Sequence, residues 1–116
     1  MRDGMYRVRF QSPTDSGDGV LVFDAGRVWG TDVGSARYDG EYLVNERTGK
    51  ADVRLKVTFP ANGMSVFGIQ NPYEWSIDVT TTLDPQHPRG QLSVQTSLQQ
   101  SLSAEYEFMR ALPEAA

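Results

Sequence analysis

The segment that decides the fold runs from Gly26 to Tyr42 and reads GRVWGTDVGSARYDGEY. Apolar and polar residues alternate along it, and a period of two is typical of β-strands. Gly30 and Gly34 lie on either side of Asp32, which predicts a corner where the carboxylate accepts hydrogen bonds from free backbone N–H groups. The segment therefore predicts a strand, a turn and a second strand.

Gly40 lies between Tyr38 and Tyr42 in the second of these strands. A glycine inside a strand allows a bulge, a bend or the close approach of another backbone. Small barrels use such glycines to curve their sheets. We therefore interpret Gly30, Asp32 and Gly40 as the structural positions of a strongly curved sheet.

The same alternation extends in both directions along the chain. It is clearest over residues 52–59, where apolar residues occupy every second position and a helix would mix the two sets. Eight strands are predicted, at residues 5–11, 19–23, 27–30, 36–44, 52–59, 73–83, 90–98 and 103–112. Residues 104–112 also fit a C-terminal helix, because apolar residues recur there at helical spacing.

Most of the connections between these strands are short and contain Gly, Pro, Asn or Asp. Short connections favour antiparallel pairing of consecutive strands. Closure of eight such strands removes the exposed edges that invite aggregation. The prediction is an all-β protein, a small eight-stranded antiparallel up-and-down β-barrel that spans residues 1–116 as one domain.

Composition narrows the classes of function. The chain has 116 residues, a net charge of −4 and scattered basic residues, which disfavours nucleic-acid binding. It has no cysteine, so disulfides and thiolate metal sites are excluded and a reducing compartment is expected. Arg2, Asp3, Arg7 and Arg9 near the start fit neither a signal peptide nor a membrane span. We expect a cytoplasmic location without membrane association.

Residues that could carry chemistry are few and scattered. His87 is the only histidine and lies in a proline-rich loop, where it has no evident nucleophile or metal-ligand partner. Asp15 and Asp18 lie in an oxygen-rich loop but lack the remaining ligands of a calcium loop. We therefore expect a protein that is not an enzyme and has no cofactor or metal.

Aromatic residues are predicted to point into the barrel. An eight-stranded barrel is either filled by its side chains or holds one small apolar ligand, and both alternatives remain open here. Inward-facing tyrosines need hydrogen-bond partners, for which Thr81 and Thr96 are candidates. The residues expected to line an interior pocket are Tyr38, Tyr42, Trp75 and Phe108.

Several stretches resemble the GrlR-type family, small negative regulators of bacterial type III secretion. The resemblance covers nearly the whole chain and is most specific in about its first 40 residues. Its motifs are Asp3-Gly4-Met5-Tyr6, residues 17–22, residues 26–32, Tyr38-Asp39-Gly40, Ser65-Val66-Phe67 and residues 75–79. The resemblance implies a lipocalin-like barrel that forms a homodimer and binds a transcriptional activator, keeping the activator from DNA.

Two positions depart from the family pattern. The Gly-Gly-Asp turn of the family is Gly30-Thr31-Asp32 here, and its acidic partner-binding loop aligns with Asn45, Glu46, Arg47 and Thr48. That loop has no net charge here, so it lacks the electrostatic steering that a run of carboxylates provides. The predicted partner-binding residues are this loop and Trp29. The alternatives are a lipocalin-like carrier of a small apolar molecule and a barrel enzyme such as an isomerase or cyclase.

Overall fold

The computed structural model describes residues 3–114 and contains eight β-strands in this range. No helix long and apolar enough to cross a membrane occurs among these residues. The strands are β1 (Gly4–Gln11), β2 (Ser16–Asp24), β3 (Arg27–Asp32), β4 (Arg37–Val44), β5 (Ala51–Phe59), β6 (Trp75–Leu83), β7 (Arg89–Thr96) and β8 (Ser101–Arg110).

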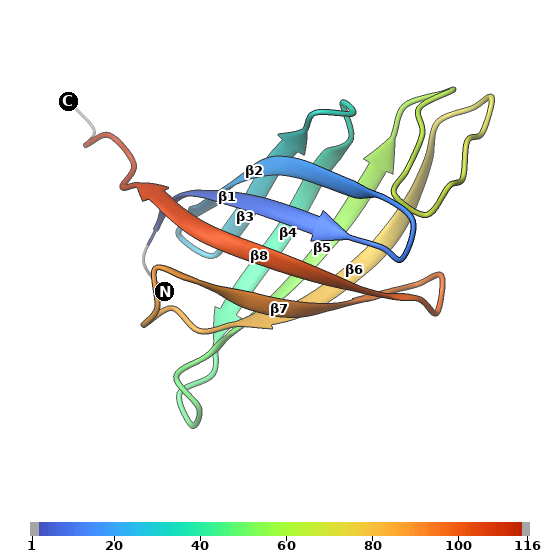
Figure 1. Ribbon diagram of the computed structural model, residues 1–116. Helices are drawn as coiled ribbons and strands as arrows, with labels where there is room; N and C mark the ends of the chain where they lie inside the picture. The colour runs from blue at the N-terminus through green and yellow to red at the C-terminus, as the bar shows by residue number, and fades with distance from the viewer. Residues whose placement is uncertain (1–2, 115–116) are drawn as a thin grey trace.

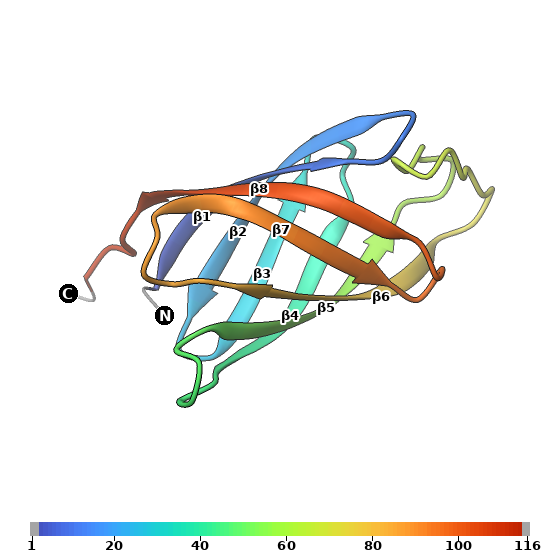
Figure 2. The same ribbon diagram turned by 60° about the horizontal axis from the view of Figure 1, so that its bottom comes forward.

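Each strand pairs antiparallel with the next one, and β8 returns to pair with β1, which closes the barrel. Figures 1 and 2 show that the strands form one closed sheet and that the long connection between β5 and β6 extends beyond one end of it. The predicted all-β, eight-stranded up-and-down barrel is confirmed. The C-terminal helix alternative is wrong, because β8 is a strand that forms ladders with both β7 and β1.

Pairing with a neighbour moves some strand ends away from the predicted positions. β2 begins at Ser16 because Ser16 pairs with Gln11 of β1, three residues before the predicted start. β3 continues to Asp32, which pairs with Gly19. β7 ends at Thr96, where the Gln99 N–H donates to the Thr96 carbonyl at 3.1 Å and turns the chain into β8.

The two ends of the barrel differ. At one end β1 begins and β8 ends, and aromatic side chains fill the interior. Tyr6 packs against Phe23 and Phe108 with ring centroids 4.9 and 5.3 Å apart, and Phe23 also packs against Tyr42 at 5.3 Å. We call this the aromatic end. The turns between β1 and β2, β3 and β4, β5 and β6, and β7 and β8 form the opposite end, called here the open end.

Gly30 and Gly40 occur where neighbouring backbones approach closely. A Cβ atom at Gly30 would overlap the Val20 carbonyl oxygen, and one at Gly40 would overlap that of Arg54. Neither glycine has a positive φ, so crowding rather than backbone conformation requires the missing side chain. The close approach expected at Gly40 is present, and the two glycines permit tight contact of β3 with β2 and of β4 with β5.

The seam between β6 and β7 is the least extensively paired ladder among the described strands. It has two residue pairs, Val79 with Thr96 and Thr80 with Gln95. Beyond these pairs, the Thr81 hydroxyl donates to the Ser93 carbonyl at 2.9 Å. Closure of the barrel at this seam therefore depends on side-chain contacts as well as on backbone hydrogen bonds.

Candidate functional site

A cavity of about 150 Å³ lies inside the open end. Apolar side chains from β5, β6, β7 and β8 form much of its wall. The cavity reaches the surface between the β3–β4 turn and the β5–β6 connection, where Val33 and Met64 form part of its rim. The wall residues contributed by these four strands are Val57, Phe59, Ile77, Val79, Val94 and Leu102.

A second cavity of about 60 Å³ lies deeper in the barrel. Phe10, Tyr38, Val79 and Val94 line both cavities, so the two are neighbours separated by these side chains. The interior is therefore neither completely filled nor a single wide pocket. Most of its unfilled space lies toward the open end, and the smaller cavity extends to Tyr6 and Phe23 of the aromatic end.

The first half of the connection between β5 and β6, residues 60–74, contributes Pro60 and residues 63–67 to the lining of the larger cavity. It is held to the β1–β2 turn by the Ser12 hydroxyl, which donates to the Val66 carbonyl at 2.6 Å. Within the segment, Met64 and Gln70 form an isolated antiparallel bridge. Ser65 is buried at its centre, and its hydroxyl oxygen accepts the N–H groups of Phe67 and Ile69 at 3.3 Å. This internal bonding holds Val66 and Phe67 against the cavity.

Asp32 and Tyr38 form a polar pair in the cavity wall. One Asp32 oxygen accepts the N–H groups of Gly34 at 2.9 Å and Ala36 at 3.0 Å, which is the capping role expected for this corner. The other oxygen accepts the Tyr38 hydroxyl at 2.7 Å. The Tyr38 ring is buried and stacks on Phe10. Burial and, to a smaller extent, the adjacent Asp32 carboxylate raise the pKa of Tyr38, so its hydroxyl remains protonated and donates.

Of the four residues predicted to line a pocket, Tyr38 alone lines either of the two cavities. Tyr42, Trp75 and Phe108 line neither of these two cavities. Tyr42 and Phe108 lie at the aromatic end, and Trp75 stacks on Phe59 with ring centroids 4.6 Å apart. Alternation identifies the face of a strand to which a side chain belongs, but not its height along the barrel axis.

The hydroxyls of Tyr38, Tyr42 and Tyr106 have partners other than the predicted Thr81 and Thr96. Tyr42 donates to the Asp3 carboxylate and Tyr106 to the Asp84 carbonyl, while the Thr96 hydroxyl donates to the Gln100 carbonyl. Burial is the largest cause that raises the pKa of Tyr42 and of Tyr106, and the nearby carboxylates of Asp3 and Asp84 raise them further. Loop and terminal residues, which have no strand pattern, therefore satisfy these hydroxyls.

The predicted partner-binding residues lie apart on the surface of the barrel. The loop of Asn45, Glu46, Arg47 and Thr48 is exposed and internally bonded, because the Asn45 side chain accepts the Arg47 N–H at 2.9 Å. Trp29 lies on the outer face of β3, with the Arg27 guanidinium over its ring. Trp29 pairs with Asp39, six residues before Asn45, which corresponds to roughly 20 Å along an extended strand.

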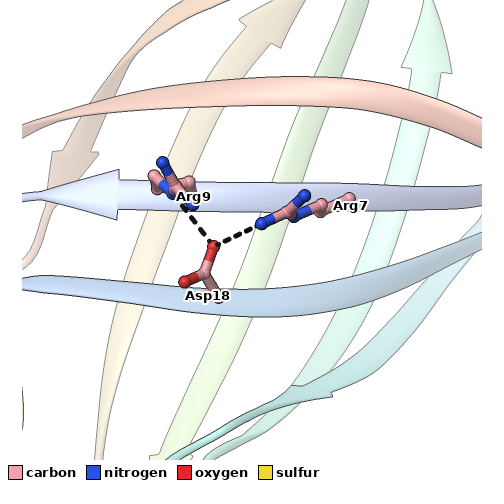
Figure 3. Close-up of polar contacts among 3 residues, drawn as sticks. All are labelled: Arg7, Arg9 and Asp18. Atoms are coloured by element: carbon pink, nitrogen blue, oxygen red, sulfur yellow. Dashed lines mark hydrogen bonds and ion pairs between the residues drawn. The ribbon is translucent and has the colours of Figure 1, made fainter.

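The other polar candidates have ordinary surface partners. Figure 3 shows that one Asp18 oxygen faces both Arg9 Nε, at 3.1 Å, and Arg7 Nη2, at 3.7 Å. His87 Nε2 lies 3.5 Å from the Asp84 carboxylate on the surface. Within residues 3–114, no group of three His, Cys, Asp or Glu side chains could hold a metal ion. Exposed pairs of this kind contribute little to stability.

The rim and the cap of the cavity were not predicted from the sequence. Val33, Met64, Val66 and Phe67 are apolar residues in turns or loops, and all four line the larger cavity. Connecting segments are mostly polar, so apolar side chains between turn residues are unusual. This was the signal in the sequence that could have pointed to a buried or ligand-covering role for these residues. That signal does not say which cavity such side chains cover.

Comparison of the chain with models of known families gives no match, and comparison with curated proteins gives none either. The resemblance to GrlR-type regulators therefore stays a prediction that rests on the motifs quoted above.

Proposed function

We propose that this protein is a non-enzymatic binding protein that takes a small apolar molecule into the cavity at its open end. The observation that carries the proposal is the cavity of about 150 Å³, walled mainly by apolar side chains and reaching the surface beside Val33 and Met64. The same barrel seals its opposite end with packed aromatic rings. This arrangement supports entry from one end.

The size of the cavity supports a ligand of limited bulk. An apolar cavity of roughly 150 Å³ holds a benzene-sized ring, whereas drug-sized ligands occupy roughly 300–1,000 Å³. Water gains few hydrogen bonds there, because much of the lining is aliphatic or aromatic. The cavity therefore suits one ring or the end of an alkyl chain, with the rest of a longer ligand outside.

The rim supports the same function. Val33 is 82% exposed and Met64 is 58% exposed, although both are apolar and both line the cavity. Exposed apolar surface around the mouth of a cavity is typical of a binding site, because the part of a bound ligand that protrudes from the cavity covers this surface. Burial of such surface contributes roughly 25 cal/mol per Å².

Toluene is expected to bind the wild-type protein and to shift the amide NMR signals of the residues around the larger cavity. Val57→Phe places a ring in the cavity and is expected to weaken toluene binding about tenfold or more, equivalent to at least 1.4 kcal/mol. Val22→Phe makes the same change on the outer face of β2 and serves as the control. Equal toluene affinity in Val57→Phe and the wild type, with both variants folded by thermal melting, would contradict the proposal.

An exposed apolar residue beside the β4–β5 loop favours a second candidate, the binding of a protein partner. Leu43 is 76% exposed on β4, directly before the half-buried Val44 and the bonded loop of residues 45–50. The GrlR resemblance supports a regulator that binds a transcriptional activator, as in the control of type III secretion, and that acts as a homodimer. The absence of cysteine supports a cytoplasmic location for either candidate.

Native mass spectrometry of the protein purified from its own host is expected to give the mass of two copies if the second candidate is correct. Leu43→Asp introduces a charge into an apolar contact and is expected to shift the population toward the monomer, whereas Val33→Asp at the other end of the barrel is the control. A wild-type monomer at micromolar concentration would contradict the dimeric regulator. The same spectrum reports a small molecule that purifies with the protein.

A further inference from the structure

The charges around the larger cavity have one sign. Asp15 and Asp32 are the charged residues among those that line it, and neither lysine nor arginine is among them. Arg37 is adjacent to Tyr38 in sequence, but its side chain lies outside the barrel and pairs with Glu74 at 3.2 Å. A ligand in the cavity therefore meets negative charge without a compensating cation.

Asp32 retains capacity for one more hydrogen bond. An ionised carboxylate has about four lone-pair sites, and Asp32 accepts three donors, from Gly34, Ala36 and Tyr38. These donors hold the carboxylate in place, so a ligand does not have to order it on binding. Asp32 is also half-buried beside an apolar wall, where a charge is screened less than at the open surface.

Tyr38 adds a second acceptor at the same position. Its hydroxyl proton is donated to Asp32, which leaves lone pairs on the phenolic oxygen. Asp32 and Tyr38 thus offer acceptor positions side by side in the wall of an apolar cavity. A group that carries several N–H donors and a positive charge matches this arrangement.

We propose that the cavity selects apolar amines, in which a ring or alkyl group fills the cavity and a protonated amine binds the Asp32 carboxylate. This inference rests on the proposed function. It distinguishes the site from one for fatty acids or other apolar carboxylates, whose charge would be repelled by Asp15 and Asp32. Hydrogen bonds to charged groups are strong enough for an expected preference on the order of tenfold over a neutral ligand of the same shape.

Three probes that share one ring test the selection at pH 7: benzylamine, toluene and benzoate. Isothermal titration calorimetry with the wild type is expected to give benzylamine affinity about tenfold above that of toluene, and benzoate affinity below that of toluene. Asp32→Asn keeps an oxygen for the Gly34 and Ala36 N–H groups and removes the charge. It is expected to bring benzylamine to the toluene level and to leave toluene binding unchanged.

Asp39→Asn is the matched control, because Asp39 is an exposed carboxylate next to Tyr38 in β4 and does not line the cavity. It removes the same charge from the protein and is expected to leave the benzylamine preference intact. If Asp32→Asn does not fold, Tyr38→Phe replaces it as the test. That variant removes the phenolic acceptor but keeps the carboxylate charge and frees one of its acceptor positions, so the preference for benzylamine over toluene is expected to persist. Loss of the preference would overturn the assignment of the amine to Asp32.

The outcomes separate the two proposals. Toluene binding with equal or weaker benzylamine binding overturns the amine selection and leaves the apolar-ligand function standing. An equal loss of benzylamine affinity in Asp32→Asn and Asp39→Asn also overturns it, since a general charge effect then explains the preference. Failure of all three probes to bind the folded wild type overturns both proposals.

Discussion

Gly40→Ala is expected to lower the free energy of unfolding by about 3 kcal/mol or more, at the upper end of what overpacking costs. The added Cβ would overlap the carbonyl oxygen of Arg54 and crowd the Cα of Leu55, which are backbone atoms of the paired strand β5. A side chain could rotate away from such an overlap, but a backbone carbonyl can move only with its strand. Urea denaturation monitored by tryptophan fluorescence measures the change.

Gly34→Ala is the matched control for this substitution. Gly34 has no positive φ, and the nearest atom to its added Cβ is an Asp32 oxygen at 3.4 Å, an ordinary contact. Alanine there is expected to be neutral or to stabilise by up to about 1 kcal/mol, because it restricts the unfolded chain. Similar midpoints for the two variants would show that β4 and β5 separate at little cost and would contradict the close approach.

Phe23→Ala is expected to destabilise the barrel by about 3–5 kcal/mol, the range for removal of a large buried aromatic ring. Phe23 is 1% exposed and is one of the two largest fully buried side chains among the described residues. It packs between Tyr6 and Tyr42 at the aromatic end. Removal of the Phe23 ring reduces the apolar surface that is buried on folding and leaves a cavity. Tyr6 and Tyr42 cannot easily close this cavity, because they are held by different strands, β1 and β4.

Met109→Ala removes a large apolar side chain from an exposed position on β8. It is expected to change the free energy of unfolding by less than about 0.5 kcal/mol. Calorimetric melting of both variants provides the comparison. If Phe23→Ala lowers the free energy of unfolding by less than about 1 kcal/mol, the side chains of the aromatic end repack around the missing ring, which contradicts the packing described here.

The fold was predictable because its signals are local. In residues 52–59 the inward row of Val53, Leu55, Val57 and Phe59 is evident from alternation alone, and the structure buries all four. The last strand was harder to predict, since its residues fit both periods. Residues 101–110 form a strand rather than a helix because they pair with β1 and β7. The pairing with β1 involves residues far away in sequence.

The candidate site was predictable only in part. Asp32 was expected to cap backbone N–H groups, and it does. Its contact with the Tyr38 hydroxyl was not predicted, although both residues lie in the segment from Gly26 to Tyr42. The contact depends on the twist of β3 and β4 relative to each other, which the sequence pattern does not give. Val66 and Phe67 cover the cavity through a loop whose path no periodic pattern describes.

By itself, the sequence determined which faces of eight strands are apolar and where the chain turns, because both are properties of neighbouring residues. Only the tertiary structure decided the height of each side chain along the barrel axis. Closure sets the stagger between strands, and that stagger places Tyr42 and Phe108 in the packed end and Tyr38 at the cavity. The same closure brings Asp32 and the β5–β6 connection to one opening, and so makes a site from residues that the sequence keeps apart.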